Sequence, residues 1–233
     1  AERDADRIYA VIDALGSSSD GRAKSVYAPR PEGQANALRR TYAQIEFGPE
    51  QVELVEAHGT GTKAGDAAEF KGLSTAFAES GREDLQWCAI GSVKSQIGHT
   101  KSTAGAAGLV KAALALYQKI LPPTAKLDRP NPKMGFGKSP FYLSPRARPW
   151  IRAADHPRRA AVSAFGFGGS NFHAVLEEHG DTHVPPMWAA EAELFLFGAD
   201  SLTELGAQLD AVVAADEPTL AHRARASHLA WKP

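Results

Sequence analysis

The chain has 233 residues, of which 43% are hydrophobic and 23% are charged, a balance typical of globular proteins and not of disordered or fibrous ones. Its 26 basic and 27 acidic residues leave a formal net charge of −1, which argues against attachment to nucleic acid or to an anionic membrane through bulk electrostatics. This length predicts one large domain, or one domain with an appendage.

Cys88 is the one cysteine of the sequence. The chain can therefore form no internal disulfide, no cysteine-based zinc site and no CxxC redox pair, which favours a reducing, cytoplasmic setting. No apolar run approaches the roughly 18 residues of a membrane span, and the charged residues 1–7 do not resemble a signal peptide. Because the first residue is Ala1 and not Met, we expect the chain to begin at a cut.

The first part of the chain predicts strands and helices in alternation. In chain order they are a strand, a helix, a strand and a helix, over residues 8–15, 34–47, 52–57 and 66–81. The first strand should stop at the turn residues 16–21, which are rich in Gly and Ser. The second helix should begin at Asp66, an N-cap residue followed three positions later by Glu69.

The second part continues this alternation, which places the body of the protein in the α/β class. Its predicted elements are a strand, a helix, a short strand and a strand pair, over residues 88–93, 103–119, 141–143, 159–165 and 171–177. A boundary is expected near residues 180–186. Beyond it, a strand over 193–197 and helices over 201–215 and 220–231 predict a small α/β unit that should continue past Pro233.

Three polar motifs flanked by glycine each follow a predicted strand. They read E-A-H-G-T-G-T over residues 56–62, S-V-K-S-Q-I-G-H over 92–99 and F-G-F-G-G-S-N over 165–171. Ligand sites of α/β folds lie at strand ends, where glycine lets the backbone approach a ligand closely. A single strand-end histidine is more often structural, but Lys94 indicates function because lysine is almost never buried without a partner.

Several common sites are disfavoured by the same motifs. Neither G-x-G-x-x-G nor G-x-x-x-x-G-K-[ST] occurs there, which argues against a nucleotide fold, and no G-x-S-x-G nucleophile elbow is present. His58 and His99 lie 41 positions apart without a third ligand at metal spacing, so no metal site is predicted.

Together, these motifs resemble the β-ketoacyl synthase family, the condensing enzymes of fatty acid and polyketide synthesis, from about residue 8 to residue 178. Residues 187–233 resemble the start of the linker that joins ketosynthase to acyltransferase in type I synthases. The sequences of residues 23–29 and 65–70 most resemble those of iterative synthases of the polyunsaturated-fatty-acid and enediyne types. The resemblance implies a thiolase-like fold of α-β-α-β-α layers. Residues 1–180 would be its C-terminal half, and 187–233 the small linker unit.

The resemblance also implies a decarboxylative Claisen condensation between an acyl thioester and malonyl-acyl carrier protein. His58 and His99 match the two family histidines that assist decarboxylation, as N–H donors to the enolate oxygen. Lys94 matches the lysine that orients the second histidine. Phe167 matches the gate position, whose backbone N–H contributes to an oxyanion hole.

Further roles follow from the same resemblance. Thr60 and Thr62 should line the pantetheine arm of the carrier protein, and Gly166 and Gly168 should contact substrate. The family nucleophile sits in a T-A-C-S-S turn that this sequence lacks. Cys88 is interpreted as a structural thiol, and the nucleophile is expected outside the chain.

The implied partners are the N-terminal half of the same ketosynthase, an acyl carrier protein, an acyltransferase domain reached through the linker, and a second copy in a homodimer. No cofactor is expected to bind directly, since phosphopantetheine is carried by the carrier protein. The non-catalytic alternative is a chain-length-factor-like partner that only shapes the pocket. Because such partners usually lose the catalytic histidines, the retained His58, His99 and Lys94 favour an enzyme.

Overall fold

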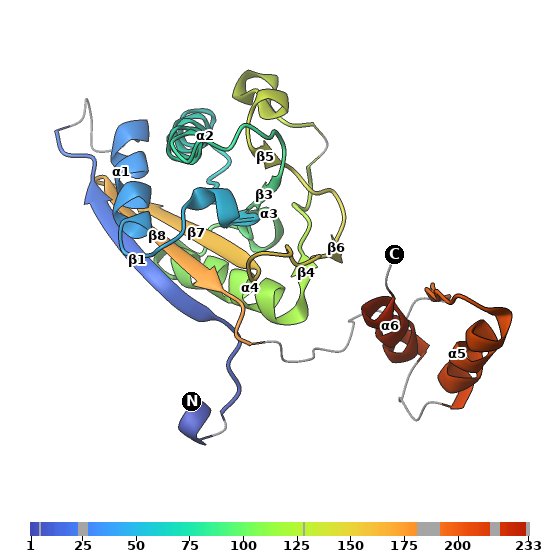
Figure 1. Ribbon diagram of the computed structural model, residues 1–233. Coiled ribbons are helices and arrows are strands. Elements are labelled where there is room, and N and C mark those ends of the chain that lie inside the picture. Colours follow the sequence, from blue (N-terminus) through green and yellow to red (C-terminus); the bar gives the residue numbers. More distant parts are fainter. Residues whose placement is uncertain (5, 23–27, 128, 181–191, 215–219, 232–233) are drawn as a thin grey trace. The chain divides into compact units, whose positions relative to one another are not determined.

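The structure, a computed structural model, describes all residues except 5, 23–27, 128, 181–191, 215–219 and 232–233 (Figure 1). The chain divides into two compact units, residues 1–182 and 183–233. The description below takes each unit by itself.

The first unit is built on a six-stranded sheet with the order β1-β8-β7-β2-β3-β5. The strands are β1 (Val11–Ser19), β2 (Leu54–Glu56), β3 (Cys88–Gly91), β5 (Phe141–Tyr142), β7 (Arg159–Gly166) and β8 (Ser170–Glu177). Strands β7, β2, β3 and β5 run parallel, whereas β8 pairs antiparallel with both β7 and β1. A separate two-stranded sheet joins β4 (Ile120–Leu121) to β6 (Arg148–Pro149). The parallel strands therefore direct their carboxyl ends to one edge, as α/β ligand sites require.

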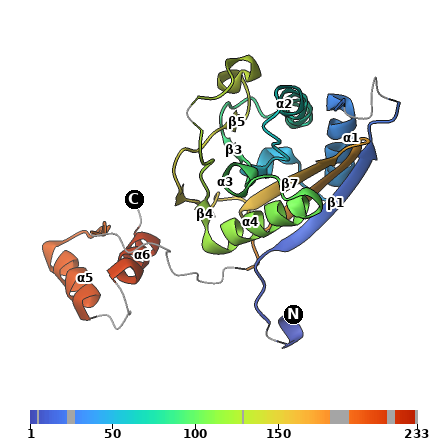
Figure 2. The same ribbon diagram turned by 180° about the vertical axis from the view of Figure 1, so that it is seen from behind.

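Helices cover both faces of this sheet. The helices α1 (Pro31–Tyr42) and α2 (Lys63–Ala78) lie on one face, and α4 (Ala104–Gln118) lies on the other (Figures 1 and 2). The short helix α3 (Lys94–Ile97) follows β3. Short 3-10 turns occupy Glu2–Asp4, Pro49–Gln51, Lys101–Thr103, Pro132–Met134 and Phe136–Lys138.

Side chains of successive strand residues lie in two different hydrophobic cores, one on each face of the sheet, because side chains alternate along a strand. Val55 and Ala161 pack with side chains of α1 and α2, whereas Leu54 and Ala160 pack with side chains of α4. Strands β2, β3 and β7 are mostly apolar because both faces of the sheet are covered. The first unit thus has three layers, α-β-α.

Several of the expected element boundaries are wrong: α1 covers Pro31–Tyr42 where a helix over 34–47 was expected, and two further differences have identifiable reasons. The first strand does not stop at Gly16 but continues through it to Ser19, paired with β8 along its length. A Cβ at Gly16 would lie 2.4 Å from Thr41 Oγ1, so glycine here lets α1 pack closely on the strand. Helix α2 begins at Lys63, because Thr62 is its N-cap and accepts the Gly65 N–H at 3.1 Å.

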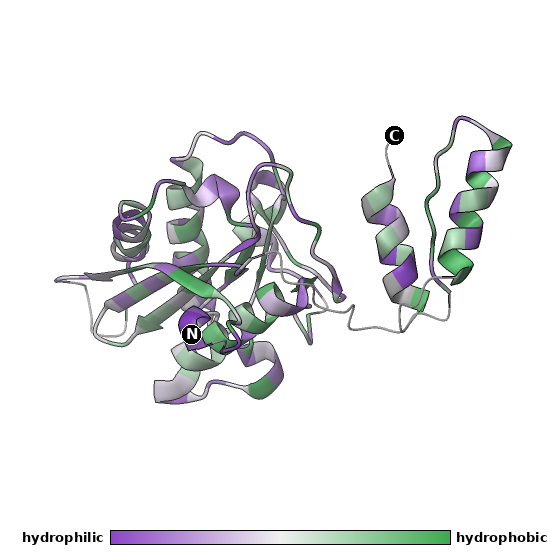
Figure 3. Ribbon diagram, turned by 60° about the horizontal axis from the view of Figure 1, so that its bottom comes forward, coloured by the Kyte–Doolittle hydropathy of each residue, from purple (hydrophilic) through white to green (hydrophobic). Residues whose placement is uncertain are grey.

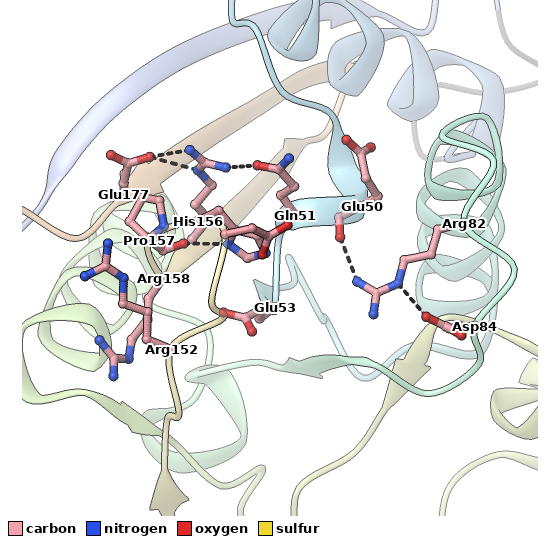
Figure 4. Close-up of polar contacts among 12 residues, drawn as sticks. Glu50, Gln51, Glu53, Arg82, Asp84, Arg152, His156, Pro157, Arg158 and Glu177 are labelled. Carbon is pink, nitrogen blue, oxygen red and sulfur yellow. Dashed lines mark hydrogen bonds and ion pairs between the residues drawn. The ribbon is translucent and has the colours of Figure 1, made fainter. Parts of the chain in front are cut away.

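Ion pairs and hydrogen bonds link polar side chains at the opposite end of the parallel strands, where β7 begins (Figure 4). Arg159 pairs with Glu177 at 2.7 Å and also donates to Gln51. The buried Arg158 pairs with Glu178 at 2.7 Å, which ties the segment before β7 to the residue after β8. These pairs hold the edge of the sheet that lies away from the three glycine-flanked motifs.

The second unit contains α5 (Leu202–Ala214) and α6 (Leu220–Ala230), and both helices carry hydrophobic and hydrophilic residues (Figure 3). The strand expected over 193–197 is absent from the described residues of this unit, which offer it no second strand. Instead, the Leu196 N–H donates to Ser227 Oγ of α6 at 3.1 Å, and the rings of Phe195 and Phe197 stack. No helix in the described parts of either unit is long and apolar enough to cross a membrane.

Candidate active site

The three glycine-flanked motifs meet at one edge of the sheet. They follow the carboxyl ends of β2, β3 and β7, which are parallel strands. A cavity of about 720 Å³ lies there, and six of the residues singled out in the sequence line it: His58, Thr60, Thr62, His99, Gly166 and Phe167. Lys94, Gly168 and Cys88 are not among the lining residues. Topology thus assembles motifs that are more than 100 positions apart in the sequence, as residues 58 and 166 show.

The two histidine rings lie close together in an edge-to-face arrangement. Their centroids are 5.5 Å apart and their planes are nearly perpendicular, at 85°. His99 Nδ1 accepts the N–H of Lys101 at 3.1 Å, so the neutral His99 ring carries its proton on Nε2. His58 Nδ1 is buried and has no hydrogen-bond partner among the described residues. The Phe165 ring, 5.9 Å from His58, closes one side of the pair.

Both rings are held neutral by their surroundings. Burial lowers the pKa of His58 to about 4, and the charges of Lys94 and His99 act in the same direction. Desolvation also lowers the pKa of His99, again with a contribution from Lys94. A neutral imidazole donates one N–H and accepts with its other nitrogen. At neutral pH neither ring then carries a positive charge, and each has one N–H.

A buried carboxylate fixes the loop that carries His58. Glu69 of α2 accepts the N–H of His58 at 2.7 Å and the N–H of Gly59 at 2.8 Å. Burial raises the pKa of Glu69 to about 7, although both N–H donors oppose the shift. Gly59 has φ +48°, and a Cβ there would lie 2.6 Å from the Ser92 Cβ, so the loop requires glycine. The sequence identified Glu69 only as a helix-capping residue.

A second buried carboxylate supports the loop that carries Lys94 and His99. Glu56, 2% exposed, accepts the Val93 N–H at 2.5 Å and pairs with Lys111 Nζ of α4 at 2.6 Å. Lys94 is partly buried, and desolvation lowers its pKa while Glu56 and Glu69 oppose that shift. No motif marks the role of Lys111, which is a single charge within a helix rich in small residues.

Phe167 lies at the tip of the turn between β7 and β8, and its side chain is 82% exposed. Gly168 and Gly169 follow with φ of +84° and +79°. Asp20, at the end of β1, holds this turn through its N–H to the Gly169 carbonyl at 2.9 Å. Its carboxylate also accepts the Asn171 amide at 2.8 Å. Asp20 was not foreseen from the sequence, which marked its neighbourhood only as a turn.

Cys88 is the first residue of β3, whereas the cavity lies beyond the other end of that strand. The residue is 0% exposed, its Sγ lies 3.7 Å from the Ala89 carbonyl, and burial raises the pKa of its thiol. A nucleophilic cysteine needs access and a lowered pKa, and Cys88 has neither. Among the described residues no group of three or more His, Cys, Asp or Glu is placed to hold a metal ion.

Comparison with known families matches residues 9–128 to the C-terminal domain of β-ketoacyl synthases. The chain belongs to this family. Residues 130–228 match the ketoacyl-synthetase C-terminal extension. The family expected from the three motifs is therefore confirmed.

Individual relatives agree with this assignment. The chain is 44% identical to polyketide synthase PksL of Bacillus subtilis over 179 residues, which are 77% of this chain and 4% of the relative. It is 42% identical over 226 residues to a polyunsaturated fatty acid synthase from a Thraustochytrium species, covering 94% of this chain and 8% of the relative. The chain thus spans only a small part of these curated relatives.

Solved structures extend the agreement to the fold. The ketosynthase from module 6 of the bacillaene synthase of Bacillus subtilis matches with a TM-score of 0.74 and 38% identity. The match covers 97% of this chain and 40% of that chain. The α/β, thiolase-like fold is therefore confirmed, and within it this chain corresponds to the C-terminal ketosynthase domain with its extension.

Proposed function

We propose that this chain supplies the histidine pair and the lysine of a ketosynthase site that performs decarboxylative Claisen condensation in chain elongation. The observation that carries the proposal is the pair of neutral imidazoles, His58 and His99, 5.5 Å apart on one cavity. Two N–H donors at this spacing fit one developing oxyanion. The substrates would be an acyl thioester and malonyl-acyl carrier protein.

The reaction assigns each group a task. A cysteine thiolate first takes the acyl group as a thioester. The malonyl group then loses CO2, and the electron pair of the broken C–C bond forms an enolate whose oxygen accepts the N–H groups of His58 and His99. The enolate carbon attacks the acyl thioester and the cysteine thiolate leaves. Lys94 acts as a positioning residue: its charge helps to keep both imidazoles neutral, and therefore able to donate without repelling each other.

The remaining lining residues would bind the substrate arm. We assign Phe167 to gating, because its exposed ring projects from a turn whose two glycines permit backbone motion. Its backbone N–H would serve the oxyanion hole of the acyl thioester. Thr60 and Thr62 line the cavity beside His58 and would contact the pantetheine arm. Gly166, which also lines the cavity, and Gly168, in the adjoining turn, would contact the substrate.

The nucleophile would come from an N-terminal half of the ketosynthase. The burial of Cys88 supports this assignment. So does α4, which presents Val110, 58% exposed, and Leu114, 43% exposed, on one apolar stripe. A second α/β half placed on α4 would bury that stripe and complete the five layers of a thiolase-like domain.

The wider assembly is also part of the proposal. Residues 1–180 would be the ketosynthase half and 187–233 the start of the linker to an acyltransferase domain. The carrier protein would bring its phosphopantetheine arm into the cavity, and the intact enzyme would be a homodimer. The reducing, cytoplasmic setting inferred from the single cysteine stays a prediction.

The test is CO2 release from malonyl-acyl carrier protein by the intact ketosynthase. We expect His58→Ala and His99→Ala each to slow release by about 100-fold or more, since each removes one oxyanion donor. His156→Ala is the matched control, because His156 lies among the polar contacts at the opposite edge of the sheet (Figure 4). Unchanged release in both site variants would refute the assignment and favour the non-catalytic, chain-length-factor-like alternative.

A further inference from the structure

One charged side chain on the cavity has no partner in the described parts of the protein. The acidic and basic residues of the lining are Asp20, Glu69 and Lys101. Glu69 and Asp20 are each bonded to neighbouring groups. The side chain of Lys101, by contrast, forms no ion pair or hydrogen bond with any described residue. The cavity therefore has one positive charge that is available to a ligand.

Lys101 lies beside one ring of the histidine pair. Its backbone N–H donates to His99 Nδ1 at 3.1 Å, and its φ of +57° is a left-handed conformation that lysine seldom adopts. Strained backbone of this kind is concentrated at ligand sites. The charge of Lys101 also lowers the pKa of His99, so the ammonium group lies within electrostatic range of the ring. Lys101 thus places its charge next to the imidazole that would bind the thioester oxygen.

We propose that Lys101 is a binding residue whose ammonium group pairs with the free carboxylate of the malonyl group. This inference rests on the proposed function, because it takes His99 to bind the malonyl thioester oxygen. A single methylene joins the carboxylate to the thioester carbonyl, which keeps the carboxylate within reach of the turn that carries Lys101. The phosphate of the phosphopantetheine arm is the other anionic group of the substrate, but it lies at the far end of the arm from the histidine pair.

Such a contact would make the site selective for a carboxylated extender unit. A hydrogen bond between an ammonium and a carboxylate is stronger than one between neutral groups, although solvent weakens it at an exposed side chain. The balance corresponds to about a five- to tenfold change in affinity. Because the carboxylate leaves as CO2, the contact should act on the binding of the malonyl group more than on the chemical step.

Calorimetric binding to the intact ketosynthase tests this with amide analogues, in which an NH group replaces the thioester sulfur. The amide prevents acyl transfer, and it also slows CO2 loss because an amide forms an enolate less readily than a thioester. Three pantetheine probes are needed. The first carries a malonyl group with its free carboxylate, the second has a carboxamide in place of that carboxylate, and the third is the second probe with a phosphate on its arm.

The variants separate the charge of Lys101 from its backbone. Lys101→Met removes the ammonium group and keeps the apolar stem, whereas Lys101→Arg keeps the charge. Both leave the hydrogen bond to His99 in place, since the backbone makes it. Lys71→Met is the control, because Lys71 is an exposed lysine of α2 that does not line the cavity, and its loss changes the net charge equally.

We expect Lys101→Met to weaken binding of the carboxylate probe about five- to tenfold, with no comparable loss for the other two probes. Lys101→Arg should restore most of that affinity. An unchanged affinity for the carboxylate probe, an equal loss for all three probes, or the same loss in Lys71→Met overturns the proposal. A loss confined to the phosphate probe also overturns it, and assigns Lys101 to the far end of the arm instead.

The measurement also separates this inference from the proposed function, because no condensation is needed to observe binding. CO2 release that persists in His58→Ala and His99→Ala contradicts the proposed function, whether or not Lys101→Met loses affinity for the carboxylate probe. Release that falls in those variants, together with unchanged binding by Lys101→Met, contradicts this inference alone.

Discussion

The ion pair between Glu56 and Lys111 should stabilise both the fold and the loop of Lys94. The Glu56 side chain is 2% exposed and that of Lys111 is 13% exposed, so water screens the pair little. Lys111→Met removes the ammonium group and leaves a buried carboxylate whose other contact is the Val93 N–H. The variant keeps the apolar stem of the side chain, so packing changes little.

The magnitude follows from the loss of one partner of a buried pair, which costs about 3–5 kcal/mol. Burial already raises the pKa of Glu56, and Lys111 opposes that shift. Without Lys111 the carboxyl should take up a proton, which limits the cost to about 3 kcal/mol. Adding Glu56→Gln should recover part of this, because the amide oxygen still accepts the Val93 N–H and no buried charge remains.

The assay is urea denaturation of the intact ketosynthase, followed by fluorescence, for the two single variants and the double variant. Arg39→Met is the control, since Arg39 pairs with Glu79 at the surface and should lose less than about 1 kcal/mol. We expect a coupling free energy above about 1 kcal/mol between positions 56 and 111. A Lys111→Met loss as small as that of the control, or no coupling, would refute the reasoning.

Three further outcomes are expected. Lys94→Met should raise the pKa of His58 from about 4 toward its ordinary 6.5, measured by NMR titration; an unmoved pKa would contradict the electrostatic role given to Lys94. Burial lowers the pKa of His173 to about 3, below its unfolded value, so its neutral form stabilises the fold above about pH 6.5 and that contribution is lost as the pH falls toward 3. His173→Phe should flatten this acid-side loss in denaturation midpoints between pH 6.5 and 4, and an unchanged slope would show that another group causes it. Cys88 should react with a thiol reagent only after unfolding; fast labelling of Cys88 itself in the native protein, located by peptide mapping, would contradict its burial.

Much of the fold was predictable because its signals are local. Alternating and apolar runs marked β2, β3, β7 and β8, and helical spacing marked α1 and α4. The errors arose where a distant contact decides the outcome. The Gly and Ser residues of 16–19 resemble a turn by composition, yet pairing with β8 and close packing by α1 make them a strand.

The site residues also fall into those that the sequence predicts and those that it does not. His58, His99 and Lys94 were identified from their motifs, because the motif carries the residue type and the strand-end position together. Their supports were missed, since Glu69 and Lys111 reach the motifs from other helices. Only the register of helix against sheet brings these charges into contact, and no local pattern encodes it.

The two half-reactions of the intact ketosynthase test the central claim most directly, in a variant carrying both His58→Ala and His99→Ala. We expect CO2 release from malonyl-acyl carrier protein to fall by about 100-fold or more. A labelled acyl thioester should still acylate the protein, with the label on a peptide outside this chain. CO2 release at the wild-type rate, or the label on Cys88, would contradict the account.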